Sequence, residues 1–534
     1  MFDWAKRIYG GPTTLYVLAV CVVFAAAFSA VFDAKVDLNG DNAKYYLLAQ
    51  SIAEGKGYVK VFAPDTPPTS LYPPGYPLLM SGLMLFTDSV VAQKGMNGLF
   101  LLGAALMLFL LLKAVTNDER FAALMAGFTV INYHLLKFST IMMSEASFLL
   151  VSLLALYALV QRHEDRAPWR DPRFYAFLGA LSFAFHIRTQ GVSLLAGVLF
   201  YFLCTRRWAE LATTLGGFAV LALPWRLRNR WQGLGSSRYL DQLIQANPWR
   251  PEAGEVGVTG LLGRFVEQGR MIITQAIPDS IFNFVTVDYQ AAPSGVMWIV
   301  GMGGLAVLLY GFWQMGQYRF LFLGYFLAVF GIVALWSATV DNRYLVTFIP
   351  FLQAGFFYGA YDLGRRALDR WGPSLAPSVV LPVALLVVGG AMVPQLGVLT
   401  AQAERAYPGG FYNYFESANE LGRTRDCEDT LVACRKPALF YLFSKCPVTR
   451  YRFSTEPDAV IRHLVENEVD FVVVDQLGYA STARYLYPAI KQHAALFRTV
   501  IRKKDPDTFV LKFRREKARR ALGRAPADST SRRN

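Results

Sequence analysis

The chain has 534 residues, of which 54% are hydrophobic and only 17% are charged, which is less charge than a soluble domain of this size carries. The formal net charge is +14, but Lys and Arg stand at the ends of long apolar blocks, where membrane proteins place them, so no nucleic-acid partner is expected. The composition therefore indicates a protein whose main solvent is a lipid bilayer.

Eleven apolar blocks follow one another along the chain, each near the length that crosses a hydrocarbon core of about 30 Å. The first block, 14–32, follows Lys6 and Arg7 and has no small-residue cleavage site behind it, so it is predicted to be a retained span. The others are 92–113, 119–137, 146–160, 174–187, 190–205, 208–225, 294–314, 319–338, 344–362 and 376–398. A further apolar piece within 73–87 has only about eleven residues, too few to cross unaided.

The basic residues between these blocks indicate the orientation. If 73–87 does not cross, the loop 161–173 with its four Arg residues lies on the cytoplasmic side together with the N-terminus, as the positive-inside bias requires. If 73–87 did cross, that loop would lie outside. We therefore predict an α-helical polytopic membrane protein with about eleven spans. The piece 73–87 is then re-entrant or interfacial, with backbone that lines a cavity or is buried in protein.

Three polar segments are then expected outside the cytoplasm: the loops 33–74 and 226–293, and the part of the chain beyond 398. Within the first loop, 42–54 carries apolar residues on one face at helical spacing, which predicts an amphipathic helix lying on the membrane. The predicted domains are a membrane domain at 1–398, a small extracytoplasmic α/β domain at 399–513 and a disordered basic tail at 514–534.

The α/β assignment of 399–513 depends on a helical pattern at 458–466 and on apolar, strand-like runs at 471–475 and 508–513. Cys427, Cys434 and Cys446 also lie in this segment, at spacings unlike those of a zinc site. If the segment is extracytoplasmic, one disulfide among the three cysteines is expected, with one thiol left over.

Two acidic residues stand at the expected outer face. Asp41 precedes the helix predicted at 42–54, and Glu145 precedes the span 146–160. Each could be a helix cap, because a carboxylate at a helix start accepts backbone hydrogen bonds and is stabilised by the helix dipole. Their position on the same side of the membrane favours the alternative interpretation, which is that they are catalytic.

Two arginines also lie on this face, against the positive-inside bias. Arg188 interrupts an apolar run at an outer turn, and Arg343 lies in another outer loop. An arginine at membrane depth usually faces a cavity or a partner. One such partner is a phosphate group, which a guanidinium binds bidentately. The alternative is an ion pair within the chain, for example of Arg343 with Asp341 or Asp41.

Weaker candidates accompany these four residues. Lys44 and Lys60 in the first loop could bind phosphate, although solvated or headgroup-facing lysines would give the same pattern. His186 is interpreted as a packed or cavity-lining histidine. The sequence has no GxxxxGK[ST], HExxH or paired CxxC motif, so nothing indicates an ATP-driven pump or a zinc protease, and no metal or other cofactor is expected.

The ordered set of motifs resembles the GT-C glycosyltransferases, above all the protein O-mannosyltransferases and the lipid A aminoarabinose transferases. The matching segments are Gly40–Tyr45, Tyr72-Pro-Pro-Gly-Tyr-Pro77, Met143–Glu145, Arg188-Thr-Gln-Gly191, Leu223–Asn229 and Arg343-Tyr344 through Pro350. Two positions depart from the family pattern. Thr189 stands where the family often has Pro, and Asp41 stands alone where the protein mannosyltransferases have an Asp-Glu pair. The lone acid weakens the case for a protein acceptor and for a bound metal.

The resemblance implies a GT-C fold and the transfer of one sugar from a polyprenyl-phosphate donor to a lipid, glycan or protein, with inversion, at the outer face of an inner membrane. It implies that Asp41 is the general base, that Glu145 orients the acceptor or Arg188, and that basic residues bind the donor phosphate. The implied phosphate-binding residues are Arg188, Arg343, Lys44 and Lys60. The implied cavity-lining residues are Tyr45, Tyr72, Tyr76, His186 and Tyr344.

Two other functions are compatible with the same membrane pattern. A flippase or transporter of lipid-linked sugars would explain the spans and the membrane arginines, but transporters tend to show internal repeats, and the sequence shows none. A lipid-linked oligosaccharide ligase or polymerase would share an outer active site and differ in the size of its donor.

Overall fold

The computed structural model describes residues 12–235, 242–247, 250–284, 287–337, 342–371 and 377–523. The chain forms two compact units. The first, here called the membrane unit, consists of Met1–Val36, Ser70–Ile244 and Val256–Glu404. The second, here called the α/β unit, consists of Asp37–Thr69, Gln245–Glu255 and Arg405–Asn534, so that it includes part of each predicted outer loop.

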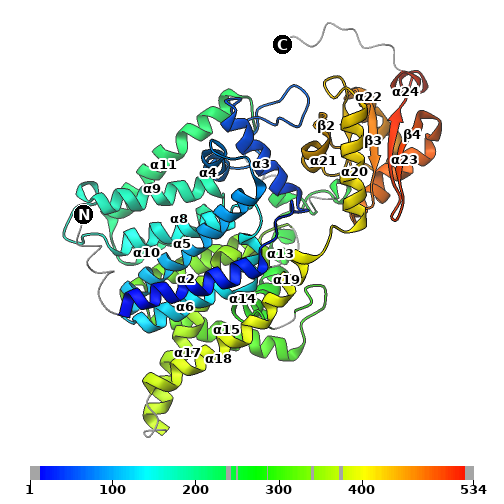
Figure 1. Ribbon diagram of the computed structural model, residues 1–534. Coiled ribbons are helices and arrows are strands. Elements are labelled where there is room, and N and C mark those ends of the chain that lie inside the picture. The colour runs from blue at the N-terminus through cyan, green and yellow to red at the C-terminus, as the bar shows by residue number, and fades with distance from the viewer. Residues whose placement is uncertain are drawn as a thin grey trace. The chain divides into compact units, whose positions relative to one another are not determined.

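The membrane unit is helical, and each of the eleven predicted apolar blocks is a helix or a bent helix pair. Its longer helices are α2 (Pro12–Val31), α5 (Val90–Thr116), α6 (Glu119–Ile131), α8 (Glu145–Val160), α9 (Pro172–Ile187), α10 (Gly191–Cys204), α11 (Trp208–Trp231), α13 (Val258–Met271), α15 (Gly295–Gln314), α16 (Arg319–Ala334), α17 (Ile349–Trp371) and α18 (Pro377–Met392). Shorter ones are α4 (Gly75–Met84), α7 (Tyr133–Ser139), α14 (Ile277–Ile281) and α19 (Leu396–Glu404). Helices α5, α8 and α9 pack side by side (Figure 1).

The predicted span 119–137 is broken. Helices α6 and α7 meet at an angle of 58°. At the break, the side chain of Asn132 accepts hydrogen bonds from the backbone N–H groups of His134 and Leu135 and so caps a new helix. By length and composition, five described helices can cross a membrane, or six if the bent pair is one span. The number of spans therefore stays a prediction.

Close backbone contacts join the helices of the membrane unit. A methyl group on Gly197 of α10 would lie 2.6 Å from Cα of Tyr325 in α16, and one on Gly301 of α15 would lie 2.5 Å from the carbonyl oxygen of Ile273. Such small-residue contacts are the means by which helices associate in lipid, where the hydrophobic effect does not drive them together. Apolar side chains such as Leu15 and Ile299 remain exposed, as a lipid-facing surface requires.

The α/β unit is built on a five-stranded sheet with the order β2-β1-β3-β5-β4. The strands are β1 (Val432–Ala433), β2 (Val448–Thr449), β3 (Phe471–Val474), β4 (Phe497–Lys503) and β5 (Thr508–Phe513). The first three are parallel, whereas β5 is antiparallel to both β3 and β4. The strands predicted at 471–475 and 508–513 are thus confirmed.

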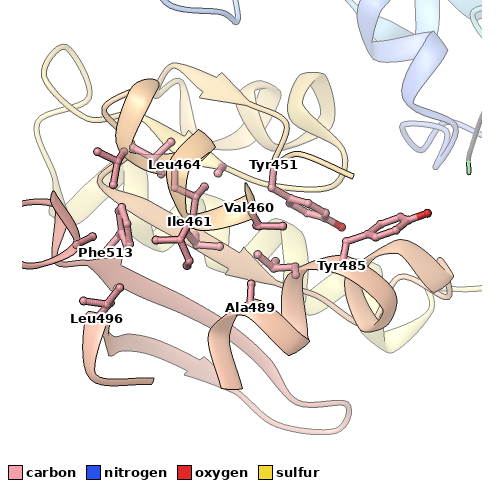
Figure 2. Close-up of a cluster of buried hydrophobic side chains, with 14 residues drawn as sticks. Tyr451, Val460, Ile461, Leu464, Tyr485, Ala489, Leu496 and Phe513 are labelled. Carbon is pink, nitrogen blue, oxygen red and sulfur yellow. The ribbon is translucent and has the colours of Figure 1, made fainter. Parts of the chain in front are cut away.

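The longer helices of this unit are α3 (Gly40–Ala53), α20 (Gly409–Thr424), α21 (Pro437–Ser444), α22 (Pro457–Glu466), α23 (Tyr487–Gln492) and α24 (Arg515–Ala521). Helix α20 packs against β4 and β5, and α21 packs against β2. The helix predicted at 458–466 is therefore confirmed as α22. Figure 2 shows the core on one face of the sheet, where Val460, Ile461 and Leu464 of α22 pack near Phe513 and Ala489.

Cysteine pairing in this unit follows the expectation of one disulfide and one leftover thiol. Cys427 and Cys446 form the disulfide, and Cys434 is buried and free.

Two expectations for this unit need correction. The helix predicted at 42–54 exists as α3, but it packs against α21, and its buried residues lie on all of its sides rather than on one. It is therefore not amphipathic, and its placement on the membrane stays a prediction. The predicted disorder from 514 onwards is wrong for the first part of the tail, because α24 buries Ala518 and packs against α22. Residues 524–534 lie outside the described part of the chain.

Candidate functional site

In the membrane unit, two of the predicted site residues form an ion pair. Glu145 is the first residue of α8, and Arg188 directly follows α9. Nη1 of Arg188 lies 2.8 Å from Oε1 of Glu145 and donates a hydrogen bond of 3.1 Å to Oγ of Ser144. The Glu145 side chain is only 1% exposed and that of Arg188 is 20% exposed. Because a buried carboxylate needs a counter-charge, Arg188 compensates the charge of Glu145.

The turn that carries Arg188 is tied to the segment that carries Tyr344. Nε2 of Gln190 donates a hydrogen bond of 3.3 Å to the carbonyl oxygen of Tyr344, and Oγ1 of Thr347 donates one of 3.2 Å to Oε1 of Gln190. The structure thus brings together two motifs more than a hundred residues apart in the sequence. Asp341, the alternative partner of Arg343, lies outside the described residues.

The predicted re-entrant piece also reaches this turn. It forms the short helix α4, whose first residue, Gly75, packs so closely that a methyl group there would lie 2.8 Å from the backbone carbon and oxygen of His186. Only glycine fits at this contact. Nδ1 of His186 lies 2.7 Å from the carbonyl oxygen of Ser182, one turn earlier in α9. Tyr72, just before α4, is buried.

Tyr76, which was expected to line the substrate cavity, contributes to a chain of hydrogen bonds in the membrane unit. Its side chain is fully buried, and its hydroxyl donates a hydrogen bond of 3.2 Å to Oδ1 of Asn97 in α5. Nδ2 of Asn97 in turn donates to the carbonyl oxygens of Ile141 and, at 3.0 Å, Met143. This chain of bonds holds the loop that leads to Glu145. Asn97 was not predicted, although a polar residue inside an apolar block is a detectable signal.

A second polar cluster of the membrane unit was also missed. Oδ1 of Asp279 in α14 lies 3.2 Å from Nε2 of His134, and Oδ2 accepts a hydrogen bond of 2.8 Å from the hydroxyl of Tyr289. Asn342 donates to the same carboxylate and lies 2.9 Å from Nε2 of His134. The cluster therefore anchors Asn342, the residue before Arg343. No sequence motif links these residues, which come from separate segments.

In the α/β unit, Asp41 is the second residue of α3 and is not its cap. The cap is Asn39, whose side chain accepts a hydrogen bond of 3.2 Å from the backbone N–H of Asp41. The interpretation of Asp41 as a capping residue is therefore wrong. Its carboxylate instead lies 3.1 Å from Nζ of Lys44, one turn further along α3.

The other predicted residues of the α/β unit are less informative. Tyr45, the residue after Lys44, is buried. Lys60 lies in the loop after α3, where its backbone N–H donates to the carbonyl oxygen of Pro67 beside a short bridge between Val59 and Pro68.

Three basic residues near Asp41 were not predicted: Arg435, Lys436 and Arg450. Burial lowers the pKa of Lys44, and Arg450 lowers it further, whereas Asp41 raises it. Burial also lowers the pKa of Lys436 to about 8, with a further contribution from Arg435. These residues are close only in the folded chain, so sequence spacing could not reveal them. Among the described residues, no three His, Cys, Asp or Glu side chains converge as metal ligands would.

Comparison with known proteins adds to this geometry. Residues 72–231 match the family model described as dolichyl-phosphate-mannose-protein mannosyltransferase. No curated protein is similar enough in sequence to match.

Matches to solved structures cover a larger part of the chain than the family model does. ArnT from Cupriavidus metallidurans, bound to undecaprenyl phosphate, is 15% identical with a TM-score of 0.54, and the match covers 94% of this chain and 98% of ArnT. The archaeal oligosaccharyltransferase AglB from Archaeoglobus fulgidus, in complex with an inhibitory peptide and a dolichol-phosphate, is 13% identical with a TM-score of 0.55. That match covers 87% of this chain and 70% of AglB. At these identities the likeness shows a shared fold.

Proposed function

We propose, from the premise that the chain is a multi-pass membrane glycosyltransferase with the GT-C fold, that it transfers one monosaccharide from a polyprenyl-phosphate donor to an acceptor hydroxyl. The reaction takes place at the extracytoplasmic face of an inner membrane. The family match supports a polyprenyl-phosphate-linked sugar as donor, and the solved relatives hold undecaprenyl phosphate or a dolichol-phosphate.

The observation that carries the proposal is the placement of Arg188. Arg188 directly follows a membrane helix, and its guanidinium pairs with a buried carboxylate. The turn that carries it is hydrogen-bonded to a distant segment. This arrangement fixes a cation in advance of any ligand. A fixed cation stabilises charge that develops on a leaving phosphate more than it stabilises the bound donor, and this difference lowers the barrier.

The proposed chemistry is a single displacement. The acceptor oxygen forms a bond to the anomeric carbon while the bond from that carbon to the phosphate oxygen breaks, and the phosphate keeps the electron pair. The acceptor proton passes to the carboxylate of Asp41, which acts as general base. Arg188 interacts with the departing phosphate, and Glu145 orients Arg188 through the 2.8 Å ion pair. Arg343 is a second candidate for the phosphate. A single displacement inverts the anomeric configuration.

A transfer assay tests this assignment. The full chain in nanodiscs is given a labelled monosaccharide on undecaprenyl phosphate and a membrane extract as the source of acceptor. We expect label transfer by wild type, and a loss of at least about 100-fold in Asp41→Asn, the range for removal of a general base. Glu54→Gln is the matched control, because Glu54 is an exposed acid just after the same helix, paired with Lys56.

The outcomes separate the alternatives. Full activity of folded Asp41→Asn would remove Asp41 from the mechanism. Movement of the labelled donor across the bilayer without transfer would favour the flippase. Transfer only from an oligosaccharide donor would favour the ligase.

A further inference from the structure

The parallel strands of the α/β unit end at one edge of the sheet, and basic side chains gather there. β1 is parallel to both β2 and β3, so the carboxyl ends of these strands share that edge. Arg435 and Lys436 follow β1, and Arg450 follows β2. After β1, the chain forms β2 on one side of β1 and then forms β3 on the other side of β1. The space at the ends of β1 and β3 is therefore a topological switch point, where open α/β sheets bind ligands.

Lys436 is held rigidly at this edge. Its backbone carbonyl accepts a hydrogen bond of 3.1 Å from the hydroxyl of Tyr414, a fully buried residue of α20. Its ammonium lies 4.5 Å from the ring centre of Tyr479, in the segment after β3, and the guanidinium of Arg435 lies 4.7 Å from the same ring. Within the described part of the chain, the Lys436 ammonium has no carboxylate at ion-pair distance.

The start of α3 lies directly against this cation. A methyl group on Gly40 would lie 3.2 Å from Cδ and 3.7 Å from Nζ of Lys436. Asp41 is the next residue, so the cations at the sheet edge adjoin the carboxylate assigned as general base.

The Lys436 ammonium lies near other cations. Burial, followed by repulsion from Arg435 and Arg450, lowers the pKa of Lys436 to about 8, although Asp41 and Asp37 raise it. The buried acid at the end of β3, Asp475, does not neutralise Lys436. Its carboxylate accepts hydrogen bonds from the Thr482 hydroxyl and the backbone N–H of Leu477. Crowded cations of this kind are stabilised by a bound anion.

We propose that Arg435, Lys436 and Arg450 form a phosphate-binding site at the β1/β3 edge, and that this site holds a phosphate group of the acceptor so that the acceptor hydroxyl lies next to Asp41. The acceptor part of this inference depends on the proposed function, whereas the phosphate site does not. Arginine favours phosphate over other anions because its planar donors match two phosphate oxygens.

Chemical modification of Lys436 tests the site without any transfer reaction. The full chain in nanodiscs is reductively methylated with and without inorganic phosphate, and the rate at each lysine is read by mass spectrometry. Bound phosphate covers Lys436 and raises its pKa, and each unit of increase lowers the reactive neutral fraction about tenfold below the pKa. We expect methylation of Lys436 to slow several-fold. Lys512, exposed on β5, is the internal control and should not change.

Two further arms distinguish the source of the phosphate. Arg450→Met should reduce the protection of Lys436, because one of the cations that hold the anion is lost. Undecaprenyl phosphate, which carries the donor headgroup, should not protect Lys436. Protection by undecaprenyl phosphate would assign the site to the donor and overturn the acceptor proposal. Absence of protection by inorganic phosphate would overturn the site itself.

A kinetic comparison then links the site to the acceptor. Lys436→Met should raise KM for the acceptor extract at least about tenfold, roughly the loss of one charge-assisted hydrogen bond, with little change in kcat. Lys512→Met removes the same charge from the same unit and should leave both constants unchanged. Unchanged KM in Lys436→Met would contradict the acceptor proposal. Absence of transfer by wild type would contradict the proposed function and leave the methylation result as the test of the site.

Discussion

The two candidate acids are both paired with a basic side chain, but in different surroundings. Glu145 is 1% exposed and lies 2.8 Å from Arg188. Asp41 is 28% exposed and lies 3.1 Å from Lys44, which is 19% exposed. Removing one partner of a buried ion pair strongly destabilises a protein, because the other charge stays buried without compensation. A partly exposed pair contributes little to stability. This difference agrees with the proposed roles, in which Glu145 positions Arg188 and Asp41 exchanges a proton with an acceptor.

The largest expected effect comes from Arg188→Gln. It leaves Glu145 buried without a counter-charge, so we expect the free energy of unfolding to fall by about 3 kcal/mol or more. Transfer should also be lost, because the phosphate loses its cation. The double variant Glu145→Gln/Arg188→Gln should recover stability but not transfer, as measured by thermal unfolding and the labelled-donor assay. Recovery of both would show that the pair is purely structural.

A third ion pair separates burial from function. Arg162 and Glu210 lie 2.6 Å apart, with side chains 4% and 12% exposed, near the other end of α8. Arg162→Met should lower the free energy of unfolding by about 3 kcal/mol, for the same reason as Arg188→Gln. Transfer per folded molecule should stay at the wild-type level, because this pair is not at the candidate site. A proportional loss of transfer would mean that stability alone explains the Arg188 result.

Asp475 shows what burial does to an acid that has no ion pair among the described residues, although the charge of Arg435 lowers its pKa. Burial raises its pKa to about 6, against hydrogen bonds from Leu477 and Thr482 that lower it. The folded state then keeps a proton that the unfolded state releases between about pH 4 and 6, so stability falls as the pH rises through this window. Asp475→Asn should remove a penalty on the order of 2 kcal/mol at pH 7.5 and less at pH 4.5. A Tm difference from wild type that does not change with pH would refute this.

The smallest effect on stability is expected for Asp41→Asn. Its pair with Lys44 is partly exposed, and the helix cap is supplied by Asn39. We expect the free energy of unfolding to change by less than about 1 kcal/mol while transfer is lost. This result would complete the contrast with Arg188→Gln. A large loss of stability in Asp41→Asn would instead indicate that the two acids have the same structural role.

Much of the fold follows from the sequence alone. An apolar block long enough to cross a bilayer must satisfy its backbone internally, so each predicted block could only be a helix. Helix α22 and strands β3 and β5 could also be predicted, because the side-chain pattern of each lies within a short stretch of the sequence. The Arg188 turn could be identified as a candidate site element because an arginine at membrane depth is unusual. The Tyr72–Pro77 segment could be identified by its resemblance to the re-entrant segment of the family.

Only the tertiary structure decided which partner each charged residue has. Glu145 could have capped a helix, and instead it pairs with Arg188. Tyr76 is linked through Asn97 to the loop before Glu145, a contact that no sequence motif indicates. Lys436 reaches the start of α3 from nearly four hundred residues away. Electrostatic and hydrogen-bond energies depend on distance and burial in space, and neither quantity is set by the spacing of residues along the chain.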